Sequence, residues 1–321
     1  MKIVLAGEYP EGTYEKIKAF FSCYSEIVFS KVDKIEEYCK MEDAEIIILR
    51  IFKAGKDIIN RNKNLKMIIR WGAGYDSVDI EEAGKQGIIV TNTPGANAGA
   101  VAELTLLLML ALNRKLKNHM KCLEEGVWSK NTYLNESFSL NNKTVGIIGS
   151  GNIGKTVAKL LNSFGAKVKY FDPYRMDLEE ENRLQMEYKD FETLIKESDI
   201  ITLHIPLLES TKNIIGRKEF KNMKDGVLII NTSRGGLIDE KALLEAIKDE
   251  KVRGAGLDGV VNEPLSKDDE LLQNPNIIVT PHIGGGTIDL ADKIIPMIVE
   301  DIMKFLNKEE IKHIVNKKFL K

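Results

Sequence analysis

The feature that most constrains the fold is a glycine pattern that joins a short apolar run to an amphipathic helical pattern. The apolar run at residues 145–148 is followed by Gly149-Ser150-Gly151-Asn152-Ile153-Gly154, and helical periodicity continues through residue 161. Glycines let the backbone approach a pyrophosphate at a helix N-terminus, where unsatisfied N–H groups favour anions. The pattern therefore predicts a βαβ unit that binds a dinucleotide.

The next predicted strand, at residues 168–171, ends at Asp172, 18 residues beyond Gly154. A carboxylate at this place can accept hydrogen bonds from both hydroxyls of the adenine ribose, and it repels a 2′-phosphate. The sequence therefore predicts NAD rather than NADP as the cofactor. Arg175, which follows closely, weakens that preference.

Alternating strands and helices extend over most of the chain. Six strands are predicted after residue 143, at 144–148, 167–171, 200–204, 227–231, 254–258 and 277–280, and their helical crossovers indicate a doubly wound dinucleotide domain. Five earlier strands, at 2–6, 26–29, 45–49, 66–69 and 87–90, predict a second parallel sheet. A long apolar helix is expected at about 98–122. The last helix, at about 288–307, is expected to return to the first sheet, which gives a discontinuous domain of residues 1–96 and 288–321 around a domain of residues 97–287.

Composition excludes several other classes of protein. The 46 basic and 48 acidic side chains give a net charge of −2, which argues against a nucleic-acid partner held by a basic face. The longest apolar run, 104–112, is too short for a membrane span, which needs about 20 residues. The three cysteines have no CxxC spacing and the four histidines have no metal-ligand spacing, so we expect no metal site and a reducing, cytoplasmic location.

Ionisable residues follow several of the predicted strands. Arg234, Glu263 and His282 come after three consecutive strands, and His204 ends an earlier one. Each alone also fits a structural role, such as a solvated turn arginine, a loop charge or a cap. Because ligands of open α/β sheets bind at the carboxyl ends of the strands, their joint placement favours a catalytic group.

Over nearly its whole length the chain resembles the D-isomer-specific 2-hydroxyacid dehydrogenases, and among them most closely the D-3-phosphoglycerate dehydrogenases. Besides the glycine pattern, the motifs that carry the resemblance are Arg70-Trp71-Gly72-Ala73-Gly74-Tyr75-Asp76, Asn92-Thr93-Pro94-Gly95, Val101-Ala102-Glu103, His204-Ile205-Pro206-Leu207, Asn231-Thr232-Ser233-Arg234-Gly235-Gly236, Asp258 to Glu263-Pro264, and Pro281-His282-Ile283-Gly284-Gly285.

The resemblance implies two Rossmann-like α/β domains with parallel sheets, one flavodoxin-like and one dinucleotide-binding, with the active site in the cleft between them. Residues 1–96 and 288–321 would form the substrate domain, and residues 97–287 the NAD-binding domain. It also implies a homodimer, formed through the helix that starts near residue 98.

The same resemblance implies a role for each candidate residue. His282 would be the general acid and base, Glu263 would orient its imidazole, and Arg234 would polarise the 2-oxo group and pair with the carboxylate. Asp258 would meet the nicotinamide carboxamide. The residues implied to bind NAD are Gly149, Gly151, Asn152, Ile153, Gly154, Asp172, His204, Ile205, Pro206, Thr232, Ser233, Asp258, Gly284 and Gly285. Those implied to bind the substrate are Arg50, Ala73, Gly74, Arg234 and His282.

The expected substrate is a small 2-hydroxy acid or 2-oxo acid. Arg50 matches an arginine that phosphoglycerate dehydrogenases place near the substrate, and with Lys53 it could neutralise a phosphate. We therefore expect oxidation of 3-phosphoglycerate to 3-phosphohydroxypyruvate, as in serine biosynthesis. The alternatives are a glyoxylate or hydroxypyruvate reductase, another D-2-hydroxyacid dehydrogenase and, from another class, an NAD-sensing protein similar to the corepressors of this fold.

Overall fold

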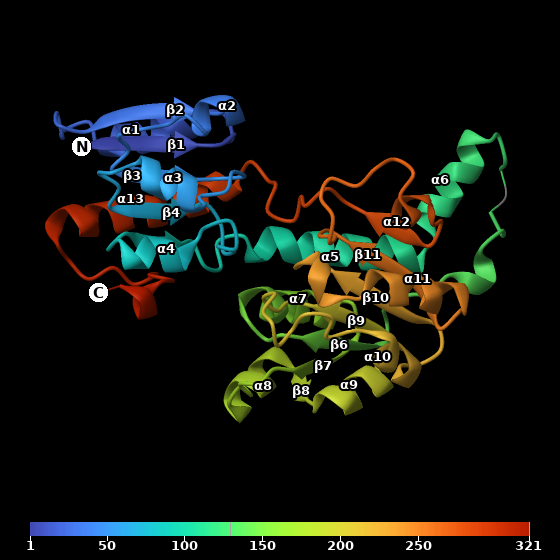
Figure 1. Ribbon diagram of the computed structural model, residues 1–321. Helices are drawn as coiled ribbons and strands as arrows, with labels where there is room; N and C mark the ends of the chain where they lie inside the picture. The colour runs from blue at the N-terminus through green and yellow to red at the C-terminus, as the bar shows by residue number, and fades with distance from the viewer. Residues whose placement is uncertain (129, 321) are drawn as a thin grey trace. The chain divides into compact units, whose positions relative to one another are not determined.

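The computed structural model describes residues 1–128 and 130–320, and the chain divides into two compact units. The first comprises Met1–Asn97 and Thr287–Lys321, and the second comprises Ala98–Gly286. The two domain boundaries expected from the sequence, after residues 96 and 287, each differ from these by one residue. Each unit is an α/β fold on a parallel sheet, as expected (Figure 1). In the described part of the chain, no helix is both long and apolar enough to cross a membrane.

The sheet of the first unit has five parallel strands in the order β2-β1-β3-β4-β5. The strands are β1 (Lys2–Ala6), β2 (Val28–Val32), β3 (Ile46–Leu49), β4 (Met67–Arg70) and β5 (Ile89–Asn92). This order is that of flavodoxin-like sheets. The second strand begins at Val28, two residues later than the sequence pattern indicates.

Alternating side chains of the first sheet enter two separate cores, because successive residues of a strand point to opposite faces. Ile3 and Leu5 pack with α1 (Thr13–Phe20) and α13 (Leu290–Asn307), whereas Val4 and Ala6 pack on the other side. That other side is covered by α2 (Ile35–Tyr38), α3 (Lys56–Arg61) and α4 (Ile80–Lys85). The C-terminal helix α13 thus belongs to the first unit.

The second unit has a seven-stranded parallel sheet in the order β12-β11-β10-β9-β6-β7-β8. Its strands are β6 (Thr144–Ile148), β7 (Lys167–Phe171), β8 (Met186–Tyr188), β9 (Ile200–Leu203), β10 (Val227–Asn231), β11 (Val252–Leu257) and β12 (Ile277–Val279). If β6 is counted as the first strand of the unit, the order is 3-2-1-4-5-6-7, which is the doubly wound order with one strand added at the edge. The direction of strand addition reverses between β6 and β9. The six predicted strands omit β8, a three-residue edge strand too short to show a periodic pattern.

Helices cover both faces of this sheet. One face carries α5 (Ala98–Asn113) and α7 (Asn152–Ser163). The other carries α9 (Phe191–Glu197), α10 (Arg217–Asn222) and α11 (Glu240–Lys248). The remaining short helices are α8 (Leu178–Leu184), α12 (Glu270–Gln273), η1 (Leu134–Glu136), η2 (Gly235–Leu237) and, in the first unit, η3 (Lys317–Phe319).

The single long helix expected at 98–122 is in fact two, α5 and α6 (Leu116–Glu124). Lys115 adopts a left-handed conformation with φ of 51°, which ends the first helix. The carbonyl of Asn113 accepts a hydrogen bond from the N–H of Phe138 at 2.9 Å instead of continuing the helical pattern. As Figure 1 shows, α6 therefore extends away from the sheet of its own unit.

Candidate active site

The glycine pattern forms an open turn between β6 and α7. A Cβ on Gly154 would lie 2.1 Å from the carbonyl oxygen of Gly149, so the first and third glycines are required for close packing. A Cβ on Gly151 would meet nothing within 4 Å, so space is open there for a ligand. Gly151 caps α7 without a side-chain hydrogen bond, and Asn152 and Ile153 form the first turn. The helix start is thus available to an anion.

Asp172, at the end of β7, is bound to this turn. Its Oδ2 accepts hydrogen bonds from the backbone N–H of Ser150 at 2.8 Å and from the Ser150 hydroxyl at 3.2 Å. Its Oδ1 accepts the N–H of Tyr174 at 2.9 Å. The carboxylate is therefore fixed beside the glycine turn, as a residue that recognises ribose hydroxyls requires. An open cradle, a helix N-terminus and a fixed carboxylate together fit a dinucleotide such as NAD.

His204 follows β9 and packs its backbone against Gly149, where a Cβ would lie 2.5 Å from the His204 carbonyl oxygen. Burial lowers the pKa of His204 to about 3, so the ring is neutral at physiological pH. Its Nε2 lies 2.9 Å from the Thr202 hydroxyl, and its buried Nδ1 has no hydrogen-bond partner among the described residues. Ile205, the first residue of Ile205-Pro206, also borders the glycine turn. The expectation that His204 and these neighbours contact the cofactor stays a prediction.

Hydrogen bonds from three neighbouring side chains hold the turn that follows β10 and carries Arg234. The side chain of Asn231 is fully buried, donates to the Arg234 carbonyl at 2.7 Å and accepts the N–H of Ser233 at 3.0 Å. The Ser233 hydroxyl donates to the carbonyl of Leu203 at 2.8 Å, and the Thr232 hydroxyl lies 2.8 Å from that of Thr105 on α5. Arg234 therefore projects from a rigid backbone.

Asp258, directly after β11, organises the loop that carries His282. Its carboxylate is 2% exposed and accepts the Thr280 hydroxyl at 2.6 Å and the N–H groups of Ile283 and Gly284, both at 2.8 Å. The contact with the nicotinamide expected from the resemblance stays a prediction. Gly284 itself is buried and the next residue, Gly285, is half-buried.

Glu263 and His282 face each other. Both carboxylate oxygens of Glu263 lie 3.3 Å from Nδ1 of His282, and each side chain is 45% exposed. Glu263 also accepts the N–H of Val260 at 3.2 Å, which anchors it to its own loop. His282 has a φ of 54°, a left-handed conformation that non-glycine residues adopt uncommonly. The pair therefore presents Nε2 of an oriented imidazole to solvent or substrate.

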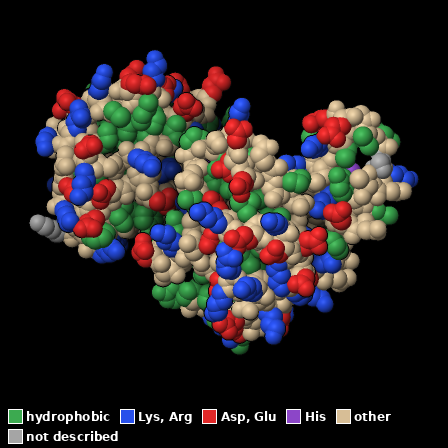
Figure 2. Space-filling view, turned by 45° about the vertical axis from the view of Figure 1, so that its right-hand side comes forward, with side chains coloured by type: hydrophobic (Ala, Val, Ile, Leu, Met, Phe, Trp, Pro, Cys, Tyr) green, Lys and Arg blue, Asp and Glu red, His purple; other side chains and the backbone are tan. Residues whose placement is uncertain are grey.

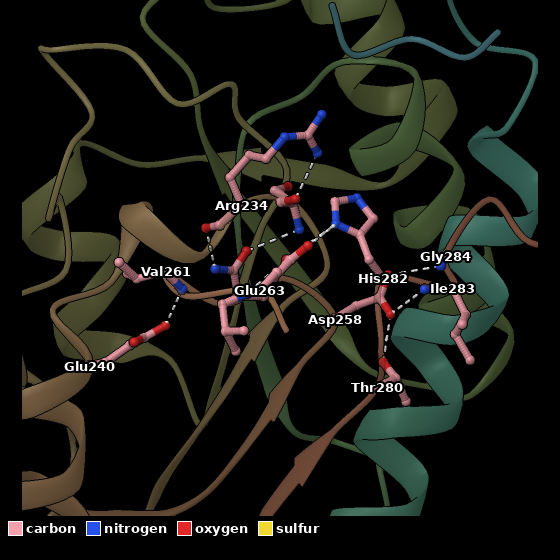
Figure 3. A network of polar contacts seen from close by, with 12 residues as sticks. Arg234, Glu240, Asp258, Val261, Glu263, Thr280, His282, Ile283 and Gly284 are labelled. Carbon is pink, nitrogen blue, oxygen red and sulfur yellow. Dashed lines mark hydrogen bonds and ion pairs between the residues drawn. The ribbon is translucent and has the colours of Figure 1, made fainter. Parts of the chain in front are cut away.

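The strand-end loops of the second unit bring the three predicted catalytic residues together. Figure 3 shows Arg234, Glu263 and His282 on neighbouring loops, with Glu263 toward the centre. A Cβ on Gly235 would lie 2.0 Å from the carbonyl carbon of Val260, so the loops after β10 and β11 are in direct backbone contact.

Three residues that support this group are not among the candidates predicted from the sequence. Asn231 braces the Arg234 turn, and Thr280 donates to Asp258. Glu240, at the start of α11, accepts the N–H of Val261 at 2.7 Å in the Glu263 loop (Figure 3). Asn231 lies within a motif quoted for the resemblance, whereas nothing in the local pattern marks Glu240.

The candidate substrate residues Arg50, Ala73 and Gly74 lie in the first unit. Arg50 follows β3 and donates to the carbonyl of Glu8. The loop after β4 is tied to β5 because the Asn92 amide donates to the Ala73 carbonyl at 2.6 Å. The structure thus gives these residues a defined setting within their own unit. In the described part of the chain, no cluster of His, Cys, Asp or Glu has the arrangement of a metal site.

Comparison with known proteins identifies the family. The profile of the D-isomer specific 2-hydroxyacid dehydrogenase, NAD binding domain, matches residues 106–284. The hydroxypyruvate reductase of Thermotoga maritima is 43% identical over 88% of this chain and 91% of its own length. The D-3-phosphoglycerate dehydrogenase of Methanocaldococcus jannaschii is 40% identical over 86% of this chain, which corresponds to 52% of that protein.

Solved structures agree with the sequence comparison. The holo form of D-mandelate dehydrogenase from Rhodotorula graminis superposes with a TM-score of 0.88 at 26% identity and covers 98% of this chain and 97% of that chain. Both sheets, the glycine cradle and the family profile lead to one conclusion. The chain belongs to the D-isomer-specific 2-hydroxyacid dehydrogenases and is an NAD-dependent oxidoreductase.

Proposed function

We propose that the chain reduces a small 2-oxo acid of the hydroxypyruvate class to the D-2-hydroxy acid, with NADH as reductant. The observation that carries the proposal is the Glu263–His282 pair at 3.3 Å beside Arg234. An oriented imidazole and a guanidinium are what the reduction of a 2-oxo acid requires. The hydroxypyruvate reductase relative, matched over most of both chains, supports the substrate class.

Each residue then has a defined task. His282 donates the proton that the substrate oxygen gains on reduction, and Glu263 stabilises the protonated imidazole and fixes its orientation. Arg234 pairs with the substrate carboxylate and polarises the 2-oxo group, for which its planar guanidinium is suited. Nicotinamide, when bound, supplies the hydride. The glycine turn at 149–154 holds the pyrophosphate, and Asp172 holds the adenine ribose.

The proposal assigns three residues of the first unit to the substrate. The backbone around Ala73 and Gly74 binds the substrate carboxylate, and Arg50 binds a polar substituent at C3. The Asn92–Ala73 hydrogen bond supports the first assignment because it holds the loop in one conformation.

Steady-state kinetics with NADH test the substrate class. Hydroxypyruvate, glyoxylate and 3-phosphohydroxypyruvate are compared at equal concentration, and the chirality of the glycerate formed from hydroxypyruvate is determined by chromatography. We expect the largest kcat/KM with hydroxypyruvate and a D product. The absence of turnover with all three acids would overturn the proposal.

A second candidate is the phosphorylated acid, which would assign the chain to serine biosynthesis. It is supported by the basic pair Arg50 and Lys53 near the end of β3. For this candidate, Arg50→Ala lowers kcat/KM for 3-phosphohydroxypyruvate far more than for hydroxypyruvate. Equal losses with the two acids would remove the phosphate assignment.

We also propose that the protein is a homodimer joined through α5 and α6, and that it acts in the cytoplasm. None of the residues of α6 is buried, and the exposed apolar side chains of this region are Leu107, Leu116, Met120, Leu123, Val127, Trp128 and Leu134. An apolar face of this kind favours association. Sedimentation equilibrium should give twice the 36.1 kDa of one chain, and Met120→Asp with Leu123→Asp should give the monomer. A wild-type monomer would contradict the dimer.

The cytoplasmic location is supported by the cysteine pattern of the sequence, which has three cysteines and no CxxC spacing.

A further inference from the structure

Arg175 lies three residues beyond Asp172, in the loop that follows β7. A guanidinium in this neighbourhood is the group that accommodates a 2′-phosphate in NADP-binding domains. From the sequence, Arg175 therefore opposes the preference for NAD that Asp172 creates.

Arg175 is held by Glu181 in a two-point ion pair. The Nε of Arg175 donates to Oε1 of Glu181 at 2.8 Å, and one terminal nitrogen donates to Oε2 at 3.1 Å. Bidentate pairs of this kind are the strong, directional form of the arginine–carboxylate interaction. The Arg175 guanidinium also holds the pKa of Glu181 below its ordinary value, so Glu181 is ionised at neutral pH.

The pair is part of a larger polar cluster. Glu181 is only 7% exposed and accepts the hydroxyl of Tyr170 at 2.8 Å, and this hydroxyl accepts the N–H of Met176 at 3.0 Å. The guanidinium of Arg175 lies 4.9 Å from the ring centre of Tyr188 on the edge strand β8. The loop 172–176 and the Arg175 side chain are thus fixed together.

Two further basic side chains pair with the neighbouring glutamate of α8, Glu180. Lys155 on α7 lies 3.1 Å from Oε1 of Glu180, and Arg183 lies 2.7 Å from Oε2 of the same carboxylate. Two adjacent carboxylates at the start of α8, Glu180 and Glu181, therefore bind three basic side chains.

We propose that Glu181 is a specificity-determining residue that enforces the choice of NAD over NADP by withholding Arg175 from a 2′-phosphate. The proposal rests on the dinucleotide site of the proposed function, with Asp172 at the ribose, and not on the identity of the acid substrate. A 2′-phosphate would be repelled by the Asp172 carboxylate. It would gain Arg175 only by leaving the buried Glu181 carboxylate without its counter-ion, with the Tyr170 hydroxyl as its remaining partner. A buried carboxylate that loses its counter-ion is unfavourable, so the pair acts as a second barrier to NADP.

Calorimetric titration of the protein with NADPH and with NADH tests this without any acid substrate. We expect the wild type to bind NADH far more tightly. Glu181→Ala should tighten NADPH binding by about tenfold or more, because the 2′-phosphate gains a charge-assisted hydrogen bond from Arg175. NADH binding should change by less than about threefold. In the double variant with Arg175→Ala, the gain should disappear.

Glu180→Ala is the matched control, because it removes a neighbouring carboxylate that does not hold Arg175. It releases Lys155 and Arg183 but leaves the Arg175–Glu181 pair in place, so it should leave the ratio of NADPH to NADH affinity unchanged if Arg175 is the cation that decides it. Glu181→Gln keeps the size of the side chain and its oxygen acceptor for Tyr170, so it serves if Glu181→Ala does not fold, and it should give a smaller gain in the same direction.

Unchanged NADPH affinity in both Glu181 variants, or a gain that survives Arg175→Ala, would overturn the inference. Failure of the wild type to bind NADH would instead overturn the proposed dinucleotide site. The ratio of kcat/KM values with NADPH and NADH, measured with an acid that the wild type turns over, provides a second readout of the same change.

Discussion

Two histidines follow strands at the carboxyl edge of the same sheet, and their surroundings are opposite. His204, after β9, is buried beside the glycine turn, and desolvation holds its pKa at about 3. His282, after β12, is 45% exposed and lies 3.3 Å from the Glu263 carboxylate. The first ring stays neutral at physiological pH, whereas the second is accessible and has a carboxylate within reach of its Nδ1.

The difference shows that position at the sheet edge is not enough to make a histidine an acid or base. β9 lies in the middle of the sheet, where neighbouring strands and the glycine turn remove water from His204. β12 is an edge strand, and its loop reaches a carboxylate supplied by the adjacent β11 loop. Of these two histidines, His282 alone combines a carboxylate partner with an exposed ring, which is the setting that the proposed proton donor requires.

The largest expected effect comes from removing the exposed ring. His282→Asn should lower kcat by about 1000-fold, because general acid–base catalysis by a positioned group contributes about 100- to 10,000-fold. Steady-state kinetics with the best acid substrate measure the loss. NADH affinity should stay within a factor of about two. A fall in kcat of less than tenfold would show that His282 is not the proton donor.

A smaller effect is expected from the carboxylate that holds the His282 loop. The Asp258 carboxylate accepts three hydrogen bonds. In Asp258→Asn one of its oxygens becomes an NH₂ group, which cannot accept a hydrogen bond, so at least one of these donors loses its partner. We expect kcat/KM to fall about 100-fold and the unfolding free energy to fall by about 1–3 kcal/mol, the cost of leaving buried groups unpaired. Urea unfolding and kinetics measure the two quantities.

Thr280→Val is the control for Asp258→Asn. It removes one donor to the carboxylate and leaves the two backbone donors in place. Its cost should be clearly smaller in both kinetics and stability. Equal losses would show that the Thr280 contact, and not the loop as a whole, carries the effect.

The smallest expected effect concerns His204 and the dependence of stability on pH. Its folded pKa of about 3 lies below the ordinary value of 6.5, so the unfolded chain takes up the proton first as the pH falls. Stability is therefore full above pH 6.5 and declines below it by about 1.4 kcal/mol per pH unit until about pH 3. Between pH 7 and pH 5 the wild type should lose about 2 kcal/mol more than His204→Asn in urea unfolding. Parallel losses in the two proteins would contradict the neutral, buried ring.

Much of the framework could be predicted because it depends on local patterns. The helix expected after the glycine pattern is observed as α7, Asn152–Ser163, and the two flanking strands have the expected bounds. The break at Lys115 and the strand β8 were missed. The first depends on a hydrogen bond from Phe138, 23 positions beyond Lys115, and the second on pairing along β7.

The sequence by itself determined the two α/β sheets, the dinucleotide turn and the family, because glycine spacing and apolar periodicity act over a few residues. The tertiary structure alone decided that His204 is buried and that Glu181 engages Arg175, whereas the contact between Glu263 and His282 was already implied by the family resemblance. These outcomes depend on which loops the fold brings together and on how much water it removes. Burial and pairing are properties of the assembled chain, and they set charge and reactivity.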